Sequence, residues 1–110
     1  MERYYVGTEL KFALTITSTG FDMNTDSWVA YVICGRKSIT CSKNNNAVID
    51  DQGQWYILVD SQYLGAGKYY LVVAIDIPDD DFNDGYRHEV LQQEKPICIV
   101  NDTYKYNSRS

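Results

Sequence analysis

The sequence predicts an all-β fold, a β-sandwich of about seven strands, and three observations lead to this class. Short runs of alternating apolar and polar residues are separated by turn residues, which is typical of a sandwich or small barrel. No stretch has the 3.6-residue period that would make a convincing helix. Tyr fills 10 of 110 positions and is favoured in strands, because its ring packs while its hydroxyl keeps a polar partner. We expect one domain over residues 1–100, followed by a C-terminal tail over residues 101–110.

The first half of the chain contains the clearest predicted strand, at residues 10–17. One face of it carries only apolar side chains, namely Leu10, Phe12, Leu14 and Ile16. A polar loop at 18–27 follows. Residues 28–34 are apolar at nearly every position, which indicates a central strand. Residues 38–42 are shorter and more polar, which indicates a strand near a sheet edge.

The second half repeats this pattern. Residues 47–49 lead into a hairpin-type turn, after which residues 55–59 alternate with their apolar side chains directed inward. Residues 69–77 form a long apolar run that a proline ends, since proline cannot donate to a β-ladder. Residues 86–91 are predicted to be its paired return strand, and residues 97–100 the last strand.

The segment before residue 69 carries the most specific local signal. The L-x-x-G-x-Y spacing of Leu64, Gly67 and Tyr69 looks like a tyrosine corner, in which a Tyr at a strand start donates its hydroxyl to an upstream backbone group. An ordinary glycine-rich turn is the alternative. Because the spacing falls at the right position among the strands, we expect an immunoglobulin-like Greek-key sandwich. Trp28 and Trp55 are then expected to fill the core between its sheets.

Charge and hydropathy narrow the classes of partner. The formal net charge is −5, so the phosphate backbone of a nucleic acid would be repelled. No stretch approaches the ~18–20 apolar residues of a membrane span, and the first residues lack the apolar core of a secretory signal. We therefore expect no nucleic-acid partner and no membrane association. We also expect folding in the cytoplasm, with the removal of an earlier secretory signal as the alternative.

Three cysteines are present, Cys34, Cys41 and Cys98. An odd number argues against a dedicated disulfide framework, and we expect three reduced thiols that pack as small hydrophobes. A Cys34–Cys41 bridge across a hairpin is the alternative. A zinc site is not expected, because His88 is the sole further soft ligand and no C-x-x-C spacing occurs. No cofactor is expected.

The acidic loop after residue 78 is a weak candidate for calcium. Asp79, Asp81 and Asn83 alternate as the ligands of a calcium loop do. The glycine of such a loop falls one place late, at Gly85, and Glu89 is not where a closing bidentate ligand would stand. A solvated hairpin tip is the simpler interpretation.

Nothing in the sequence indicates an enzyme. A hydrolytic triad needs a nucleophile and an orienting group that converge on a base, and His88 lies in a predicted hairpin without a nucleophile motif. A small hydrolase would require a cleft around His88. Tyr104 and Tyr106 are the stronger functional lead, because they lie in the tail beyond the last predicted strand. We expect them to form an interface with another chain.

Residues 49–100 resemble the N-terminal domain of the baseplate upper protein of tailed phages. The shared features are Asp51-x-Gly53-x-Trp55, Leu64-x-x-Gly67-x-Tyr69, Asp84-Gly85-Tyr86-Arg87 and Ile97-Cys98-Ile99-Val100. That family is an immunoglobulin-like sandwich used as a non-enzymatic building block of the virion.

The resemblance implies a structural module of a phage particle. A free-standing domain of this kind also suits a head-decoration, auxiliary capsid or tail protein, for example in a crAss-like phage. It would assemble with other virion subunits in the host cytoplasm. A carbohydrate-binding or adhesion module of a bacterial surface protein is the alternative. Such a module should expose two or three coplanar aromatic side chains on one face.

Overall fold

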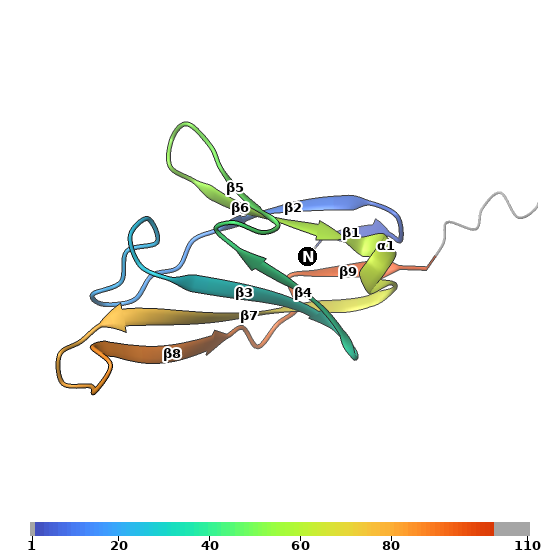
Figure 1. The fold of residues 1–110 in the computed structure, drawn as a ribbon. Helices are drawn as coiled ribbons and strands as arrows, with labels where there is room; N and C mark the ends of the chain where they lie inside the picture. The colour runs from blue at the N-terminus through green and yellow to red at the C-terminus, as the bar shows by residue number, and fades with distance from the viewer. Residues whose placement is uncertain (1, 103–110) are drawn as a thin grey trace, which may run out of the picture.

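The computed structural model describes residues 2–102, which form an all-β sandwich of two sheets, as the sequence predicts (Figure 1). The described residues contain nine strands and one short helix. In chain order, these are β1 (Arg3–Tyr5), β2 (Glu9–Leu14), β3 (Trp28–Cys34), β4 (Lys37–Ser42), β5 (Ala47–Ile49), β6 (Trp55–Asp60), α1 (Ser61–Leu64), β7 (Gly67–Pro78), β8 (Tyr86–Gln92) and β9 (Cys98–Asn101).

The larger sheet has the order β1-β9-β7-β3-β4, and β8 also pairs with β7. The smaller sheet has the order β2-β6-β5. Strand β3 lies between β7 and β4, which confirms the central position predicted for residues 28–34. Strand β4 lies at a sheet edge, as predicted from its polar composition.

The core lies between the two sheets and follows the predicted alternation. Every second residue of β3 and of β7 is buried, because successive side chains of a strand point to opposite faces. In the smaller sheet, Leu10 and Leu14 of β2 and Ile57 and Val59 of β6 close the core from the other side. At ~1.5–3 kcal/mol for each large aliphatic side chain, this burial is the main force that holds the sheets together.

Strands β8 and β9 lie on the same side of β7 but are separated by an irregular segment. Regular pairing runs to Val72–Gln92 and resumes at Tyr69–Cys98, so the segment between β8 and β9 carries extra residues. Pro96, which cannot donate to a ladder, falls within this segment. The interruption directs β8 and β9 along different parts of β7.

Three details differ from the sequence prediction. Strand β1 was not expected, and it pairs in parallel with β9, with Tyr4 opposite Val100. A strand of three residues is too short to show alternation, so this pairing depends on contacts between distant parts of the chain. The strand predicted at 10–17 ends at Leu14.

Helix α1 is the third difference, because no helix was predicted. It is a single turn, capped by the Asp60 side chain, which accepts a hydrogen bond from the backbone N–H of Gln62. Ser61 is buried, and its hydroxyl donates to the carbonyl oxygen of Thr8 at 2.6 Å and accepts from the N–H of Gly7 at 2.9 Å. Four residues are too few to show a 3.6-residue period, so the sequence pattern does not predict this helix. The Asp60 cap and the Ser61 hydrogen bonds stabilise it.

Candidate functional site

Tyr69 lies near the start of β7, just after the turn that follows α1, and is completely buried. Its hydroxyl donates a hydrogen bond of 2.6 Å to the carbonyl oxygen of Gly65, four residues upstream. This is the hydrogen bond of a tyrosine corner. Burial raises the pKa of Tyr69 to about 12, so the hydroxyl stays protonated and remains a donor at neutral pH. Leu64 is also buried and packs in the same core.

Gly67 is required beside this corner for two reasons. Its φ of +143° is a backbone conformation that residues with a side chain rarely adopt. A Cβ at this position would also lie 2.8 Å from the Sγ atom of Cys34. The turn that positions Tyr69 therefore has no room for a larger residue.

The two tryptophans differ in burial. Trp28 is buried, as expected, and its indole N–H donates to the carbonyl oxygen of Met23 at 3.2 Å. Trp55 packs edge-to-face against it, with ring centroids 5.4 Å apart. Trp55 is only half-buried, because it begins β6 at the border of the sandwich and its N–H reaches Asn24 of the adjacent polar loop at 3.3 Å. Trp55 therefore lies at the rim of the core and does not fill its centre.

All three cysteines are buried free thiols. Burial raises the pKa of Cys41 and of Cys98 to about 11, and it raises the pKa of Cys34 as well. Thiols with such pKa values carry almost no thiolate at neutral pH, so these side chains act as packing residues.

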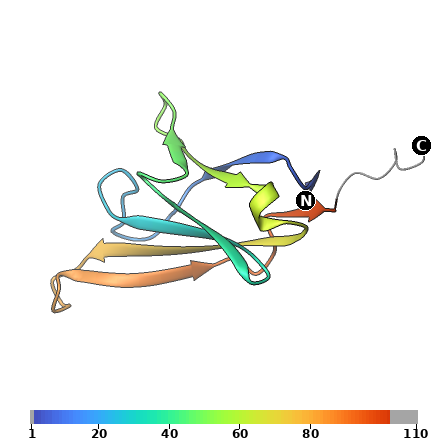
Figure 2. The ribbon, with the colours of Figure 1, turned by 45° about the vertical axis from the view of Figure 1, so that its right-hand side comes forward.

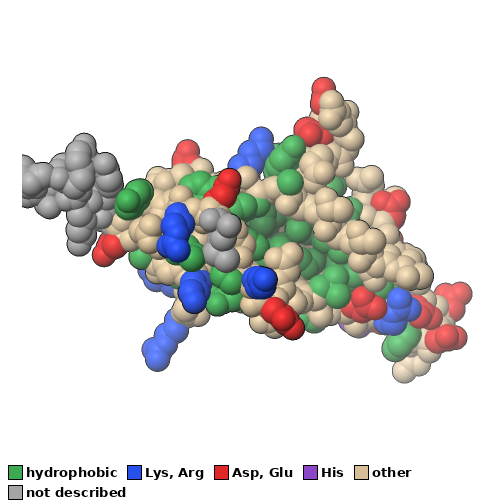
Figure 3. Space-filling view, turned by 180° about the vertical axis from the view of Figure 1, so that it is seen from behind, with side chains coloured by type: hydrophobic (Ala, Val, Ile, Leu, Met, Phe, Trp, Pro, Cys, Tyr) green, Lys and Arg blue, Asp and Glu red, His purple; other side chains and the backbone are tan. Residues whose placement is uncertain are grey.

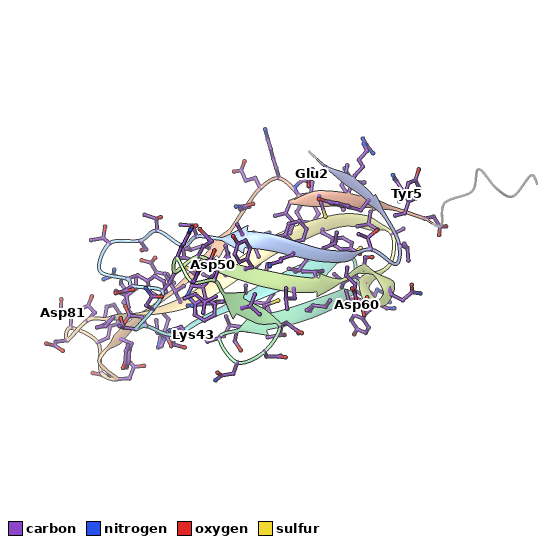
Figure 4. The ribbon with its side chains drawn as sticks, turned by 90° about the horizontal axis from the view of Figure 1, so that it is seen from above. Glu2, Tyr5, Lys43, Asp50, Asp60 and Asp81 are labelled. Carbon is purple, nitrogen blue, oxygen red and sulfur yellow. The ribbon has the colours of Figure 1, made fainter. Side chains whose placement is uncertain are left out.

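The acidic loop joins β7 to β8, and Asp81 lies at the far end of the molecule (Figure 4). The Asp79 carboxylate is occupied within the chain, because it forms an ion pair of 2.7 Å with Arg87 and accepts the N–H of Asp81. Asp81 and Asn83 are exposed. Within residues 2–102, no group of three or more His, Cys, Asp or Glu side chains is arranged to hold a metal ion. Whether Asp79, Asp81 and Asn83 bind calcium stays a prediction.

His88 is exposed, but both of its ring nitrogens have partners. Nδ1 lies 2.5 Å from Asp76 and Nε2 lies 2.9 Å from Asp84. These carboxylates, Asp76 first, raise the pKa of His88, and the contact with His88 lowers the pKa of Asp84. This cluster is not predicted from the sequence. The signal was the hairpin register, which places Asp76 directly opposite His88.

A groove opens between the sheets where β2 faces the end of β8. It encloses about 570 Å³. One wall is the stretch of chain from Phe12 to Thr17, and the other includes Leu91, Gln92 and Ile97. Core residues such as Val73 form its floor. Seen from behind, hydrophobic side chains gather in the middle of the molecule between two charged ends (Figure 3).

No family model, characterised protein or solved structure matches this chain. Among the described residues, no helix is long and apolar enough to cross a membrane.

A second groove of about 620 Å³ lies on the opposite side of the sandwich, between the smaller sheet and β4. Leu58, Ile39 and the exposed Tyr63 provide its apolar surface, while Lys11 and Asp60 are among its polar side chains. The Lys37 ammonium group lies 5.3 Å from the centre of the Tyr63 ring and donates to the backbone carbonyl of Tyr63. This groove therefore combines an aromatic ring with several polar groups.

Tyr104 and Tyr106, the predicted interface residues, lie outside the described residues. The last described strand, β9, extends to Asn101. The prediction that these two tyrosines contact another chain remains a prediction.

Proposed function

We propose that this chain is a non-catalytic structural module of a phage particle, with an immunoglobulin-like fold. It would serve as a head-decoration or auxiliary capsid protein, or as a tail or baseplate component. In this proposal it assembles in the host cytoplasm and acts by contact with other virion subunits. The resemblance of residues 49–100 to baseplate upper proteins suggests the particle.

The order of the strands supports the immunoglobulin-like class. In such sandwiches, B, E and D are neighbours in one sheet, and G, F and C are neighbours in the other, with C′ beside C in variable-type domains. If β2 to β7 are taken as B, C, C′, D, E and F, and β8 with β9 as G, the order β2-β6-β5 is B-E-D and β9-β7-β3-β4 is G-F-C-C′. The buried Trp28 then lies on strand C, and the corner Tyr69 lies near the start of strand F.

The groove between β2 and the end of β8 is the observation that carries the interaction role. It exposes apolar side chains of two edge strands beside the core, and exposed apolar surface of this kind marks interaction sites. A partner subunit that inserts a side chain or a strand there would cover apolar surface that the isolated chain leaves in water.

Two leucines of equal exposure allow a matched test. Leu91 lines this groove and Leu58 lines the second groove, and each is 37 % exposed. Particles from the phage that encodes the chain should contain it in stoichiometric amount, by mass spectrometry of density-purified virions. Leu91→Lys should be lost from the particles, because a buried charge without a partner is costly, whereas Leu58→Lys should be retained. Absence of the wild-type chain from purified virions would refute the structural role.

The second groove favours an alternative function, a carbohydrate-binding module. An aromatic ring flanked by carboxylate, amide and ammonium groups suits a sugar, which stacks on the ring and hydrogen-bonds at its edges. Binding on a glycan array that is abolished by Tyr63→Ala and unaffected by Leu91→Lys would support this alternative. If the chain binds no glycan on the same array, binding of those glycans is excluded as its function.

A further inference from the structure

Among the described residues, no strand pairs with the outer edge of strand β8. Within the described residues it pairs with β7 alone, and it forms the lower border of the ribbon in Figure 1. It also carries the most exposed large hydrophobic side chain of the described chain, Val90, at 70 %. An edge of this kind presents a row of backbone donors and acceptors that another strand can pair with.

The pairing with β7 determines which backbone groups point outward. At one end of β8, the N–H of Asp79 donates to the carbonyl of Gly85, and at the other end the N–H of Gln93 donates to the carbonyl of Leu71. In an antiparallel pair, hydrogen-bonded residues alternate along the strand, so the odd-numbered residues of β8 bond to β7. The N–H and C=O groups of Tyr86, His88 and Val90 therefore point away from the sheet.

We propose that a second copy of this chain pairs antiparallel with β8, about a two-fold axis that passes between the two His88 residues. In this register, His88 lies opposite His88 of the second copy and Tyr86 lies opposite Val90, all with outward-directed backbone groups. Arg87 lies opposite Glu89 of the second copy, and Glu89 opposite Arg87. The pairing would join two six-stranded sheets into one.

Side-chain complementarity selects this register. A two-fold axis at Glu89 would place two carboxylates opposite each other, and an axis at Arg87 would place two guanidinium groups together. An axis at Val90 would leave Arg87 opposite Gln93. The axis at His88 instead gives two Arg–Glu pairs on one face and two Tyr–Val pairs on the other, and both kinds of cross-strand pair are favourable.

The surroundings of β8 are compatible with this pairing. Tyr86 and Val90 are exposed on the outer face of the sheet, so each is free to pack against the second copy. The two His88 rings would lie on the same face, each held by the carboxylates of Asp76 and Asp84 of its own chain. These carboxylates compensate the charge of a protonated ring and so limit repulsion across the axis.

The inference goes beyond the proposed function, because it names a second copy as the partner and is measurable on the purified chain without a particle. A single strand pair is a small interface, so we expect weak association, with a dissociation constant in the micromolar range. Sedimentation velocity from about 1 μM to about 1 mM should show the mass rising from monomer to dimer. A monomer throughout this range would overturn the proposal.

Proline substitutions test the edge itself. Val90→Pro removes an outward-directed N–H and spares the bonds to β7, so the variant should fold, by circular dichroism, and remain monomeric. Ile49→Pro is the matched control on the edge strand β5. The bonds between Leu58 and Asn46 and between Asp50 and Gln54 place the Ile49 N–H on the outward side of β5. This control should dimerise as the wild type does. A dimer that persists in folded Val90→Pro would refute pairing at β8.

Charge reversal tests the register. Arg87→Glu alone places like charges across the axis, and Glu89→Arg alone does the same, so each variant should be monomeric. An equimolar mixture of the two should form a heterodimer, because each Glu then faces an Arg. Single variants that dimerise normally, or a mixture that stays monomeric, would overturn the assigned register.

Discussion

Replacement of Tyr69 by Phe isolates the contribution of the tyrosine corner. The ring stays in the core, while the hydroxyl that donates to the Gly65 carbonyl at 2.6 Å is removed. An acceptor left without its partner in a buried site costs about 1–3 kcal/mol. We therefore expect the free energy of unfolding to fall by about 2 kcal/mol, which lowers the Tm by about 8 °C for a domain of this size.

Equilibrium unfolding in urea, followed by tryptophan fluorescence, measures this change. The midpoint should move to lower urea while the slope stays constant, since the same surface is exposed on unfolding. Tyr63→Phe is the matched control, because Tyr63 is 53 % exposed and its substitution should change stability by less than about 0.5 kcal/mol.

Comparison of the two variants shows whether the corner hydrogen bond stabilises the fold. Equal stability of Tyr69→Phe and Tyr63→Phe would show that the corner hydrogen bond contributes nothing net. A second readout is alkaline pH, because the pKa of Tyr69 is raised to about 12 from its ordinary value of 10.0. This contribution to stability is fully present below pH 10 and is lost as the pH rises through 12, and Tyr69→Phe should lack that loss.

Three further predictions concern Gly67 beside the corner, His88 in the β7–β8 hairpin and Cys41 in β4. Gly67→Ala should lower the free energy of unfolding by about 2–4 kcal/mol, because the backbone at this position has a positive φ and the Cys34 sulfur lies close to the added Cβ. Adding Cys34→Ala should restore about 1 kcal/mol. If the effects of the two substitutions are strictly additive in urea melts, the steric clash is excluded. The pKa of His88, measured by NMR, should lie above 6.5 and should fall in Asp76→Asn. Because the folded state raises this pKa, the stabilisation by protonated His88 is present below pH 6.5 and is lost as the pH rises through the folded-state pKa. An unchanged pKa in Asp76→Asn would contradict the ion pair. The pKa of Cys41 is raised to about 11, so this thiol should resist iodoacetamide at pH 8 in buffer. It should react in about 8 M urea, which unfolds most domains. Equal labelling rates in the two conditions would show that the thiol is accessible in the folded chain.

The sequence was most informative where local pattern and burial agree. The alternation in β2, the apolar run of β3 and the glycines before Tyr69 predict two sheets and a corner, because each depends on neighbours a few residues away. The parallel pairing of β1 with β9 was not predictable in this way. Three residues show no period, and their partner lies at the other end of the domain.

The candidate sites were harder to predict for a related reason. The sequence places His88 in a hairpin but does not show its partners, because Asp76 and Asp84 become its neighbours only through the hairpin register. The calcium candidates alternate in sequence, yet Asp79 turns toward Arg87 in the structure. Sequence spacing reports which side chains share a strand face or loop, but the register decides which charges meet.

The contact between β1 and β9 also constrains the order of folding. The carbonyl of Glu2 accepts the N–H of Ile99, and the N–H of Val6 donates to the carbonyl of Asn101, so the first and last described strands lie side by side (Figure 2). During synthesis, β9 leaves the ribosome after all of the other described strands. Until then the strand that β1 pairs with in the described structure is missing, and one edge of β7 lies open near Tyr69. The larger sheet is therefore complete only after the described domain has been translated. A chain arrested before β9 would expose a strand edge to chaperones or to other nascent chains.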